Sequence, residues 1–337
     1  MKRTFCITFL AVALMLISTL AQAEEKPKQI TIGYLSLVNG QLIAKNLKYH
    51  EKEMGVPIKW MIFNSGRDIN TAMASGSLDF GNVGLPPATI GIAGGLNYWG
   101  IMNANVLGAV ESLVVRPGIN SLKDLEGRTV VAPFGSTTHY LLLRALNEAH
   151  VDLTKVKILD MAPGEAMAAY IRGDIDAAYI WEPSLGKIVA RGGKILLTSA
   201  EMGKQGAQTW DVITVRPEFA RNYPEFVKKF IKSELRAIDY WKKNPGESAK
   251  IVVQELSGVT EEEAHRMMAG TTLLDISGQL APSCLGSSSK KGQSANDIVA
   301  VGDFLLGQGR IKKGVSLEAA QDFLHPEYME AVKAEMK

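Results

Sequence analysis

Three turns of this chain carry small, hydroxyl and amide residues where a predicted strand passes into a predicted helix. They are Asn64-Ser65-Gly66, Asn82-Val83-Gly84 ahead of Leu85-Pro86-Pro87, and Gly135-Ser136-Thr137-Thr138. A helix N-terminus has unpaired N–H groups and about half a positive charge from its dipole, so it binds anions without Lys or Arg. Because ligands of open α/β sheets bind at the carboxyl ends of strands, we expect all three turns to face one cleft.

Each turn also has a simpler interpretation, which the sequence leaves open. Ser and Thr at a helix start commonly act only as caps, and Gly66, Gly84 and Gly135 suit ordinary turns. His139, three positions into its predicted helix, is more typical of a packing or rim residue than of a catalytic base. The hypothesis of an anion site therefore depends on the three turns together.

Two further segments place a carboxylate beside an aromatic ring. Trp181 and Glu182 end a predicted strand just before Pro183, and Trp210-Asp211 stands just before another strand. A carboxylate and a ring face together suit an ammonium group, through a charge-assisted hydrogen bond and a cation–π contact. The alternatives are a favourable dipole interaction for Glu182 and a surface salt bridge for Asp211. Together with the anion turns, these segments indicate a small zwitterionic ligand.

The framework for these residues is an alternation of strands and helices, which is typical of α/β proteins. In a first series we expect strands at residues 30–35, 58–63 and 78–84, with helices at 41–54 and 67–74. In a second series we expect strands at 129–132, 156–161 and 175–180, with helices at 137–149 and 164–172. The sequence thus predicts two α/β lobes, each with a mostly parallel sheet flanked by helices.

Two β-rich segments, residues 109–116 and 212–215, flank the second series and are predicted to be the strands that cross between the lobes as a hinge. The first lobe then comprises residues 24–108 and 218–337, and the second comprises residues 109–217. Apolar residues recur at helical spacing over 218–241, which predicts a helix packed on the first lobe. Residues 283–294 are predicted to form an exposed loop.

The N-terminus has the pattern of a cleavable export signal over residues 1–23. Lys2 and Arg3 precede a short apolar run, and Ala21-Gln22-Ala23 offers a cleavage site. The run is too short for a membrane helix, so we expect a soluble periplasmic protein. Removal of the signal takes Cys6 with it and leaves Cys284, which excludes an internal disulfide and leaves the role of this thiol open. We expect no metal and no cofactor.

Length and charge limit the classes of function. The chain has 337 residues, 46% of them hydrophobic, which suits about two globular domains. Its 37 Lys and Arg residues nearly balance 35 Asp and Glu residues, and no basic stripe is interleaved with aromatic residues. The electrostatic pattern of a nucleic-acid binder is therefore missing, which favours a small-molecule ligand.

Four strings resemble the taurine-binding proteins of bacterial sulfonate ABC importers: FNSGRDINTAMASGSLDFGNVG (63–84), FGSTTHY (134–140), RGDIDAAYIWEP (172–183) and GAQTWDV (206–212). The resemblance extends over residues 28–333. It implies the type II periplasmic-binding-protein fold, whose two lobes close over a ligand, and delivery of that ligand to an ABC permease of the inner membrane. We expect the receptor to be a monomer.

The resemblance also implies roles for particular residues. Ser136 and Thr137 match sulfonate-facing hydroxyls, Trp181 matches an aromatic wall, and Asp211 matches the carboxylate that takes the amine. The chain departs from the family pattern in two ways: Leu85-Pro86 stand where a serine pair is common, and Glu182 stands where a small residue is common. These departures leave the identity of the ligand open. The candidate ligand-binding residues are Ser65, Gly66, Asn82, Gly84, Leu85, Ser136, Thr137, Thr138, Trp181, Glu182, Trp210 and Asp211.

Two other functions are compatible with the same fold. One is an enzyme of the thiamine-pyrimidine-synthase type, whose chemistry is associated with a cysteine cluster and a histidine, whereas only Cys284 remains after the signal. The other is a receptor that feeds a sensor instead of a permease. Hydrolases are disfavoured because no Ser/His/Asp or Cys/His arrangement occurs in a nucleophile motif. The sequence therefore predicts a binding protein and no enzyme.

Overall fold

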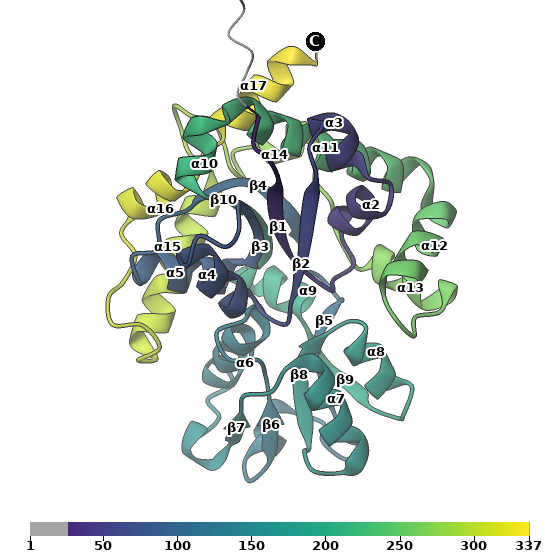
Figure 1. The fold of residues 1–337 in the computed structure, drawn as a ribbon. Helices are drawn as coiled ribbons and strands as arrows, with labels where there is room; N and C mark the ends of the chain where they lie inside the picture. Colours follow the sequence, from purple (N-terminus) through teal and green to yellow (C-terminus); the bar gives the residue numbers. More distant parts are fainter. Residues whose placement is uncertain (1–25, 337) are drawn as a thin grey trace, which may run out of the picture.

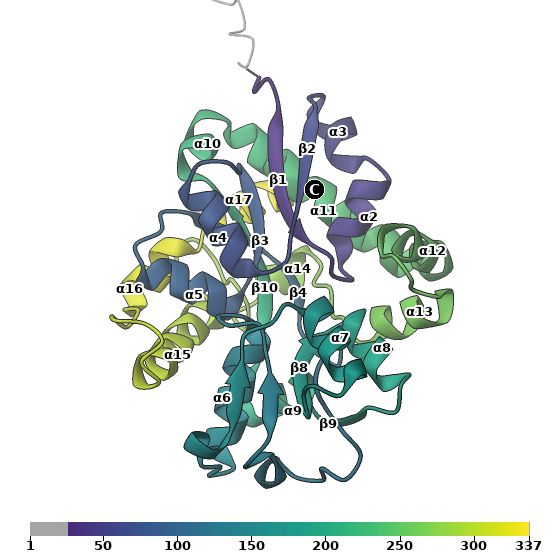
Figure 2. The same ribbon diagram turned by 60° about the horizontal axis from the view of Figure 1, so that its bottom comes forward.

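The chain folds around two separate five-stranded mixed sheets in the computed structural model, which describes residues 26–336. The predicted signal peptide and Cys6 lie outside these residues. The first sheet has the order β2-β1-β3-β10-β4 and the second β7-β6-β8-β5-β9. The two sheets occupy separate parts of the molecule (Figure 1), and the turned view shows the same separation (Figure 2). The predicted α/β class with two mostly parallel sheets is confirmed.

The strands of the first sheet are β1 (Ile30–Leu35), β2 (Ile58–Phe63), β3 (Phe80–Gly84), β4 (Trp99–Val106) and β10 (Trp210–Val215). Those of the second are β5 (Glu111–Val115), β6 (Thr129–Val131), β7 (Lys157–Leu159), β8 (Ala177–Trp181) and β9 (Lys194–Thr198). In each sheet four strands run in one direction, and one strand inserts antiparallel: β10 between β3 and β4, and β5 between β8 and β9. The six predicted strands of the two series are present, and β4 and β9 were not predicted.

The helices surround both sheets (Figure 1). The early ones are α2 (Gly40–Asn46), α3 (Tyr49–Met54), α4 (Gly66–Ala74), α5 (Leu85–Ala93), α6 (Thr137–Glu148), α7 (Pro163–Arg172), α8 (Ser184–Val189) and α9 (Ser199–Met202). The later ones are α10 (Pro217–Asn222), α11 (Pro224–Lys243), α12 (Pro245–Glu255), α13 (Glu261–Ala269), α14 (Ile276–Gln279), α15 (Gln293–Gly307), α16 (Leu317–Phe323) and α17 (Glu327–Glu335). Short turns of 3-10 or π type occur at Leu122–Leu125, Leu153–Lys155 and Gly203–Ala207.

Two helices that were predicted as continuous are each divided. The helix expected at residues 41–54 breaks into α2 and α3 at Lys48, whose φ of 55° is left-handed. The helix expected at 218–241 breaks into α10 and α11, and Pro224 begins the second piece because proline suits the first helical turn. The apolar stripe of α11 is buried as predicted. In the predicted loop at 283–294, Cys284 is buried and α15 already begins at Gln293.

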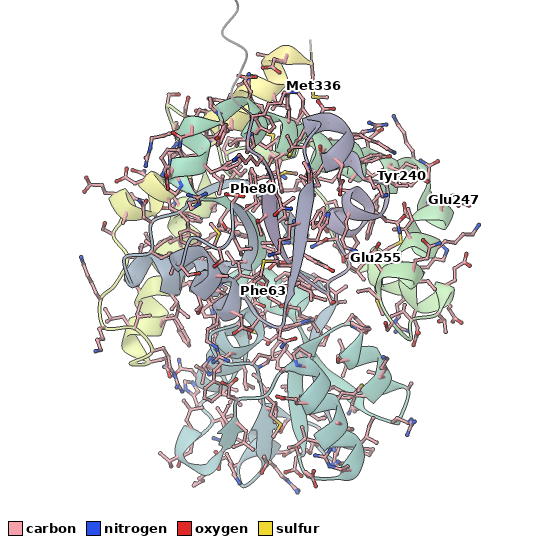
Figure 3. All side chains as sticks on the ribbon, in the orientation of Figure 1. Phe63, Phe80, Tyr240, Glu247, Glu255 and Met336 are labelled. Carbon is pink, nitrogen blue, oxygen red and sulfur yellow. The ribbon has the colours of Figure 1, made fainter. Side chains whose placement is uncertain are left out.

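The first sheet is buried on both faces. On one face, Phe80, which is labelled in Figure 3, lies in a core that includes α2 and α3. Its ring stacks on that of Phe230 of α11, with centroids 4.1 Å apart. On the other face, Val83 and Val212 belong to a core shared with α5 and α15. Because both of its faces are packed, the sheet is a rigid base for residues at its strand ends.

Within residues 26–336, no helix is long and apolar enough to cross a bilayer.

The chain crosses between the sheets twice, and both connections lie close to the two antiparallel strands. It leaves the first sheet at Val106 and enters the second at Glu111, so this connection is residues 107–110. It leaves the second sheet at Thr198 and returns at Trp210, so the second connection is residues 199–209. The predicted crossing strands at 109–116 and 212–215 are instead paired within one sheet each, β5 in the second and β10 in the first.

Candidate functional site

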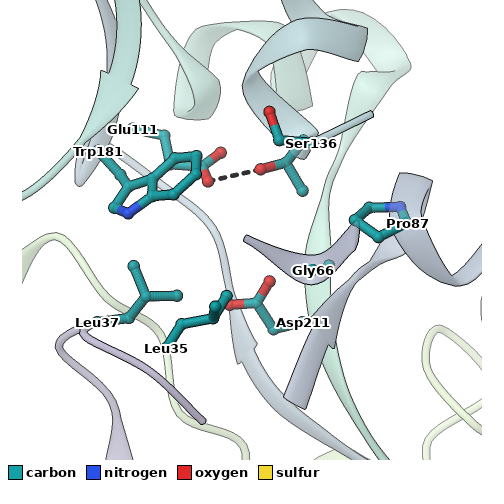
Figure 4. Close-up of a pocket in the computed structure, with 10 residues that line it drawn as sticks. Leu35, Leu37, Gly66, Pro87, Glu111, Ser136, Trp181 and Asp211 are labelled. Atoms are coloured by element: carbon teal, nitrogen blue, oxygen red, sulfur yellow. Dashed lines mark hydrogen bonds between the residues drawn. The ribbon is translucent and has the colours of Figure 1, made fainter. Parts of the chain in front are cut away.

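One cavity lies where the two sheets face each other, and residues from both sheets line it. From the first sheet's side come Leu35, Leu37, Gly66, Gly84, Pro87 and Asp211, and from the second Glu111, Ser136, Thr137 and Trp181. Figure 4 shows Glu111 and Trp181 on one side of the cavity, and Leu35, Leu37 and Asp211 on the other. Leu35, Gly84 and Trp181 end the strands β1, β3 and β8, so the cavity lies at the carboxyl ends of parallel strands.

Three helices begin at this cavity. Gly66 is the first residue of α4, Gly84 precedes α5, and Thr137 is the first residue of α6. Ser136 caps α6, because its hydroxyl oxygen accepts a hydrogen bond from the His139 N–H over 3.2 Å. The earliest N–H groups of α4 and α6 have no acceptor within their own helix, so they are available to an anion, whereas Pro86 and Pro87 leave α5 with fewer such groups. The structure thus brings the three predicted turns to one place.

Two glycines allow close approach at this point. A Cβ atom on Gly66 would stand 2.8 Å from Cγ of Pro87, and a Cβ atom on Gly84 would stand 2.7 Å from Cγ2 of Thr137. Thr137 belongs to the second sheet's side and Gly84 to the first. The absence of a side chain at Gly84 is therefore what lets α6 come this near to β3.

Asp211 is buried at the edge of the cavity, with 3% of its surface exposed. It stands opposite Gly84 in the β10–β3 register. Burial raises the pKa of Asp211 to about 7, and a side-chain hydrogen bond with Asn105 acts in the opposite direction. Its Oδ2 atom has no hydrogen-bond partner among the described residues. The carboxylate is therefore desolvated and can accept a further donor.

Glu111 is a second buried carboxylate of the cavity, and it was not predicted from the sequence. It opens β5, is 3% exposed, and accepts hydrogen bonds from Thr137 Oγ1 over 2.6 Å and Ser199 Oγ over 3.3 Å. Burial and the charge of Asp211 raise its pKa to about 8. The available signal was a single charge opening an apolar strand, ESLVV, where a solvent-facing residue is the usual expectation.

The electrostatics of the cavity are asymmetric. Two carboxylates face it from opposite sheets, and none of its described lining residues is Lys or Arg. Because a buried carboxylate is costly without a partner, the arrangement favours a cation between them. The three helix N-termini favour an anion. Leu35, Leu37, Pro87 and the Trp181 ring supply apolar walls, so the cavity is suited to a small molecule with opposite charges at its two ends.

The remaining predicted site residues do not line this cavity. Ser65 caps α4, the Asn82 amide of β3 donates to Gln41 of α2, and Leu85 belongs to the core. The Thr138 hydroxyl pairs with that of Ser136, and the Trp210 indole N–H donates to Asp297 over 3.0 Å.

Glu182 lines an adjoining cavity, which shares Leu37, Glu111 and Trp181 with the first. Its Oε2 accepts from the Gly186 N–H over 2.8 Å, and its Oε1 lies 3.5 Å from the Arg266 guanidinium. Glu182 therefore already has a cationic partner within the protein.

His139 and Cys284 have structural surroundings. His139 Nδ1 accepts from the Gly135 N–H over 3.2 Å, and burial together with Arg310 lowers the pKa of the imidazole to about 4. Cys284 is buried beside Asn103, and burial raises the pKa of its thiol to about 11, which keeps it protonated and unreactive. Over the part of the chain that the structure describes, no group of three or more His, Cys, Asp or Glu side chains is placed to hold a metal.

Comparison with known proteins gives three findings. The model of the NMT1-like family matches residues 23–257, more than half of the chain. The chain is 34% identical over 309 residues to the taurine-binding periplasmic protein of Escherichia coli, covering 90% of this chain and 92% of that protein. Among solved structures, the alkanesulfonate-binding protein SsuA of Xanthomonas axonopodis pv. citri bound to MOPS has a TM-score of 0.75 and 22% identity, covering 89% of this chain and 99% of that one.

A second solved structure shows that enzymes also use this fold. The desulfurization enzyme DSZB has a TM-score of 0.65 and 14% identity, covering 92% of this chain and all of its own. At that identity the likeness concerns the fold alone.

Proposed function

The chain belongs to the NMT1-like family, and from this premise we propose that it is the solute-binding receptor of an ABC importer. Its ligand would be a small sulfonate that also carries an amine, such as taurine. One observation supports this choice above the others: two buried carboxylates, Asp211 and Glu111, face the same cavity as three helix N-termini. The taurine-binding and sulfonate-binding relatives fit this chemistry.

The sulfonate end would bind at the helix N-termini. Its three oxygens would accept from N–H groups at the starts of α4 and α6, and from the Ser136 hydroxyl. The Thr137 hydroxyl already donates to Glu111, so Thr137 would contribute its backbone N–H. Leu85 lies in the core, which leaves backbone groups as the main donors on the α5 side, and Pro86 and Pro87 contribute no N–H there.

The ammonium end would bind between Asp211 and Glu111, against the Trp181 ring. Both carboxylates are desolvated, so a cation between them recovers the interaction energy that burial has cost. Glu182, which the sequence suggested as an auxiliary partner of the amine, has Arg266 beside it instead. We therefore assign the auxiliary role to Glu111.

We further propose that the two sheets are the centres of two lobes that close over the ligand about residues 107–110 and 199–209. Strand β10 would move with the first lobe, because it is paired between β3 and β4. Closure about two short connections is a hinge motion, which leaves each lobe internally unchanged. A receptor that closes in this way presents its permease with a different surface when it is loaded.

We infer that the chain is exported by removal of residues 1–23, acts in the periplasm as a monomer and catalyses no reaction. The export signal and the periplasmic location of its relatives support export and action in the periplasm. The protonated Cys284 thiol and the neutral His139 imidazole support the inference that the chain catalyses no reaction. Delivery to a permease is favoured over a sensor because the chain resembles the taurine-binding proteins of sulfonate ABC importers over residues 28–333.

A ligand screen on the mature chain tests this function. The protein, refolded to remove bound solute, is heated with taurine, ethanesulfonate and ethylamine, and binding is then measured by calorimetry. We expect taurine to raise the melting temperature most, since a ligand at 100 times its Kd stabilises the native state by about 2.7 kcal/mol. The proposal is contradicted if no sulfonate shifts the melting temperature, or if purified protein converts taurine to product.

A further inference from the structure

We propose that Asn105 is the third hydrogen-bond acceptor of the amine subsite, and that it makes the receptor select a primary ammonium over N-alkylated ones. This inference rests on the proposed function and names the ligand class more narrowly. Three observations carry it: the register that places Asn105, the atoms left without partners, and the donor geometry of ammonium groups.

The sheet register places Asn105 beside Asp211. Asn105 lies in β4 and is the Cα partner of Asp211 in the antiparallel β4–β10 pair. Residues directly opposite in such a pair project from the same face of the sheet, with Cβ atoms about 5 Å apart. Asn105 is 2% exposed and lines the adjoining cavity together with Glu111 and Trp181. Asn105, Asp211 and Glu111 therefore surround one small region.

Two of these side chains have unused acceptors. Asn105 makes a side-chain hydrogen bond with Asp211, in which its amide N–H donates to the carboxylate. Its own Oδ1 atom is buried without a partner among the described residues, and so is Asp211 Oδ2. Buried acceptors are rarely left unpaired in native proteins, and an unpaired one needs an explanation. A ligand with several donors provides that explanation here.

A primary ammonium matches this set of acceptors. It carries three N–H donors, and the site offers Asp211 Oδ2, Asn105 Oδ1 and the Glu111 carboxylate. Each N-methyl group removes one donor and adds volume, so it leaves one buried acceptor unpaired. Sites built to bond a particular N–H or O–H discriminate strongly against analogues that lack it. The site should therefore discriminate by donor count as well as by charge.

Calorimetry with taurine, N-methyltaurine and N,N-dimethyltaurine tests the inference on the unmodified mature protein. All three ligands are zwitterions, so the comparison isolates the number of N–H donors. We expect N-methyltaurine to bind about tenfold or more weakly than taurine, and the dimethyl compound more weakly still. Equal binding of taurine and N-methyltaurine, within about twofold, overturns the inference and leaves the proposed function intact.

The variant Asn105→Ala assigns the selectivity to this residue. We expect it to bind taurine about tenfold more weakly and to bring the taurine to N-methyltaurine ratio close to one. Asn103→Ala is the matched control, because Asn103 is a buried asparagine on the same strand that contacts Cys284 instead of lining the cavity. It should keep the wild-type ratio. Retained selectivity in Asn105→Ala overturns the inference, whereas failure of the wild-type protein to bind any sulfonate overturns the proposed function itself.

Discussion

Glu111 and Asp211 lie in different sheets and yet line the same cavity, close enough for the charge of Asp211 to raise the pKa of Glu111. Each carboxylate belongs to a different proposed lobe. A cation bound between them would therefore contact both lobes at once. The same ion that satisfies the two carboxylates would then hold the lobes together, which links recognition of the amine to closure.

The two carboxylates predict how stability depends on pH in the ligand-free protein. Their pKa values in the folded state, about 8 for Glu111 and about 7 for Asp211, lie above their ordinary values. The folded state therefore holds protons that the unfolded state releases, and stability falls as pH rises from about 4 to about 8. Urea unfolding across this range should show a smaller decline in the double variant Glu111→Gln, Asp211→Asn. Identical pH profiles in both proteins would refute the assignment.

Ligand binding should reverse this titration. An ammonium between the carboxylates favours their ionised forms, so taurine should bind more tightly as pH rises from about 6 to about 8, and binding near neutral pH should release protons. Calorimetry in buffers of different ionisation enthalpy measures that release. Ethanesulfonate, which lacks an amine, is the control and should release none. A buffer-independent enthalpy for taurine would count against a site made of these two groups.

Gly84 should be essential for closure. A Cβ atom at this position would stand 2.7 Å from Thr137 Cγ2, and these residues belong to opposite lobes. We expect Gly84→Ala to fold normally, to bind taurine about tenfold or more weakly, and to keep a larger radius of gyration at saturating ligand, as measured by small-angle scattering. Gly246→Ala is the control, since a Cβ atom there meets nothing within 4 Å. Wild-type compaction of Gly84→Ala would contradict the closed geometry.

Among residues 26–336, two ion pairs join the proposed lobes. Arg266 of α13 faces the buried Glu182 at 3.5 Å, and Arg67 of α4 faces Asp160 at 3.0 Å on the surface. Loss of Arg266 would leave a buried carboxylate without its cationic partner, so Arg266→Gln should raise the dissociation rate of the ligand by about tenfold.

The surface pair and a pair inside one lobe serve as comparisons. Arg67→Gln should have a smaller effect, because its pair is exposed. Arg172→Gln breaks a surface pair with Asp174 inside the second lobe and should have none. Stopped-flow measurements of ligand dissociation test these expectations. Equal rates in Arg266→Gln and wild type would show that the Arg266–Glu182 pair does not hold the closed state.

The parallel strands were predictable from sequence because their apolar runs and the turns after them are local signals. Strands β1 and β2 begin and end where the pattern placed them. Strand β4 was missed because Asn103 and Asn105 interrupt its apolar run, and asparagine is unfavourable in strands.

The residues of the candidate site also divide into those that a local sequence pattern marks and those that only the folded structure brings to the site. Gly66, Gly84, Ser136 and Thr137, which line the cavity, were predicted because a turn into a helix has a local pattern. Glu111 and Asn105 were not found, because their importance comes from neighbours far along the chain: Thr137 for one and Asp211 for the other. Sheet register and the approach of two lobes are long-range relations that a single sequence does not display.

Calorimetry of Asp211→Asn with taurine and with ethanesulfonate tests the central claim most directly, because the two ligands share the sulfonate and differ in the amine. The account predicts that the variant loses about 2 to 5 kcal/mol of taurine binding, since the ammonium keeps its desolvation cost and loses its main charged partner. Ethanesulfonate should bind the variant as well as or better than it binds wild type, because a repelling carboxylate is gone. Wild-type affinity of Asp211→Asn for taurine would contradict the assignment of this cavity to an amino sulfonate.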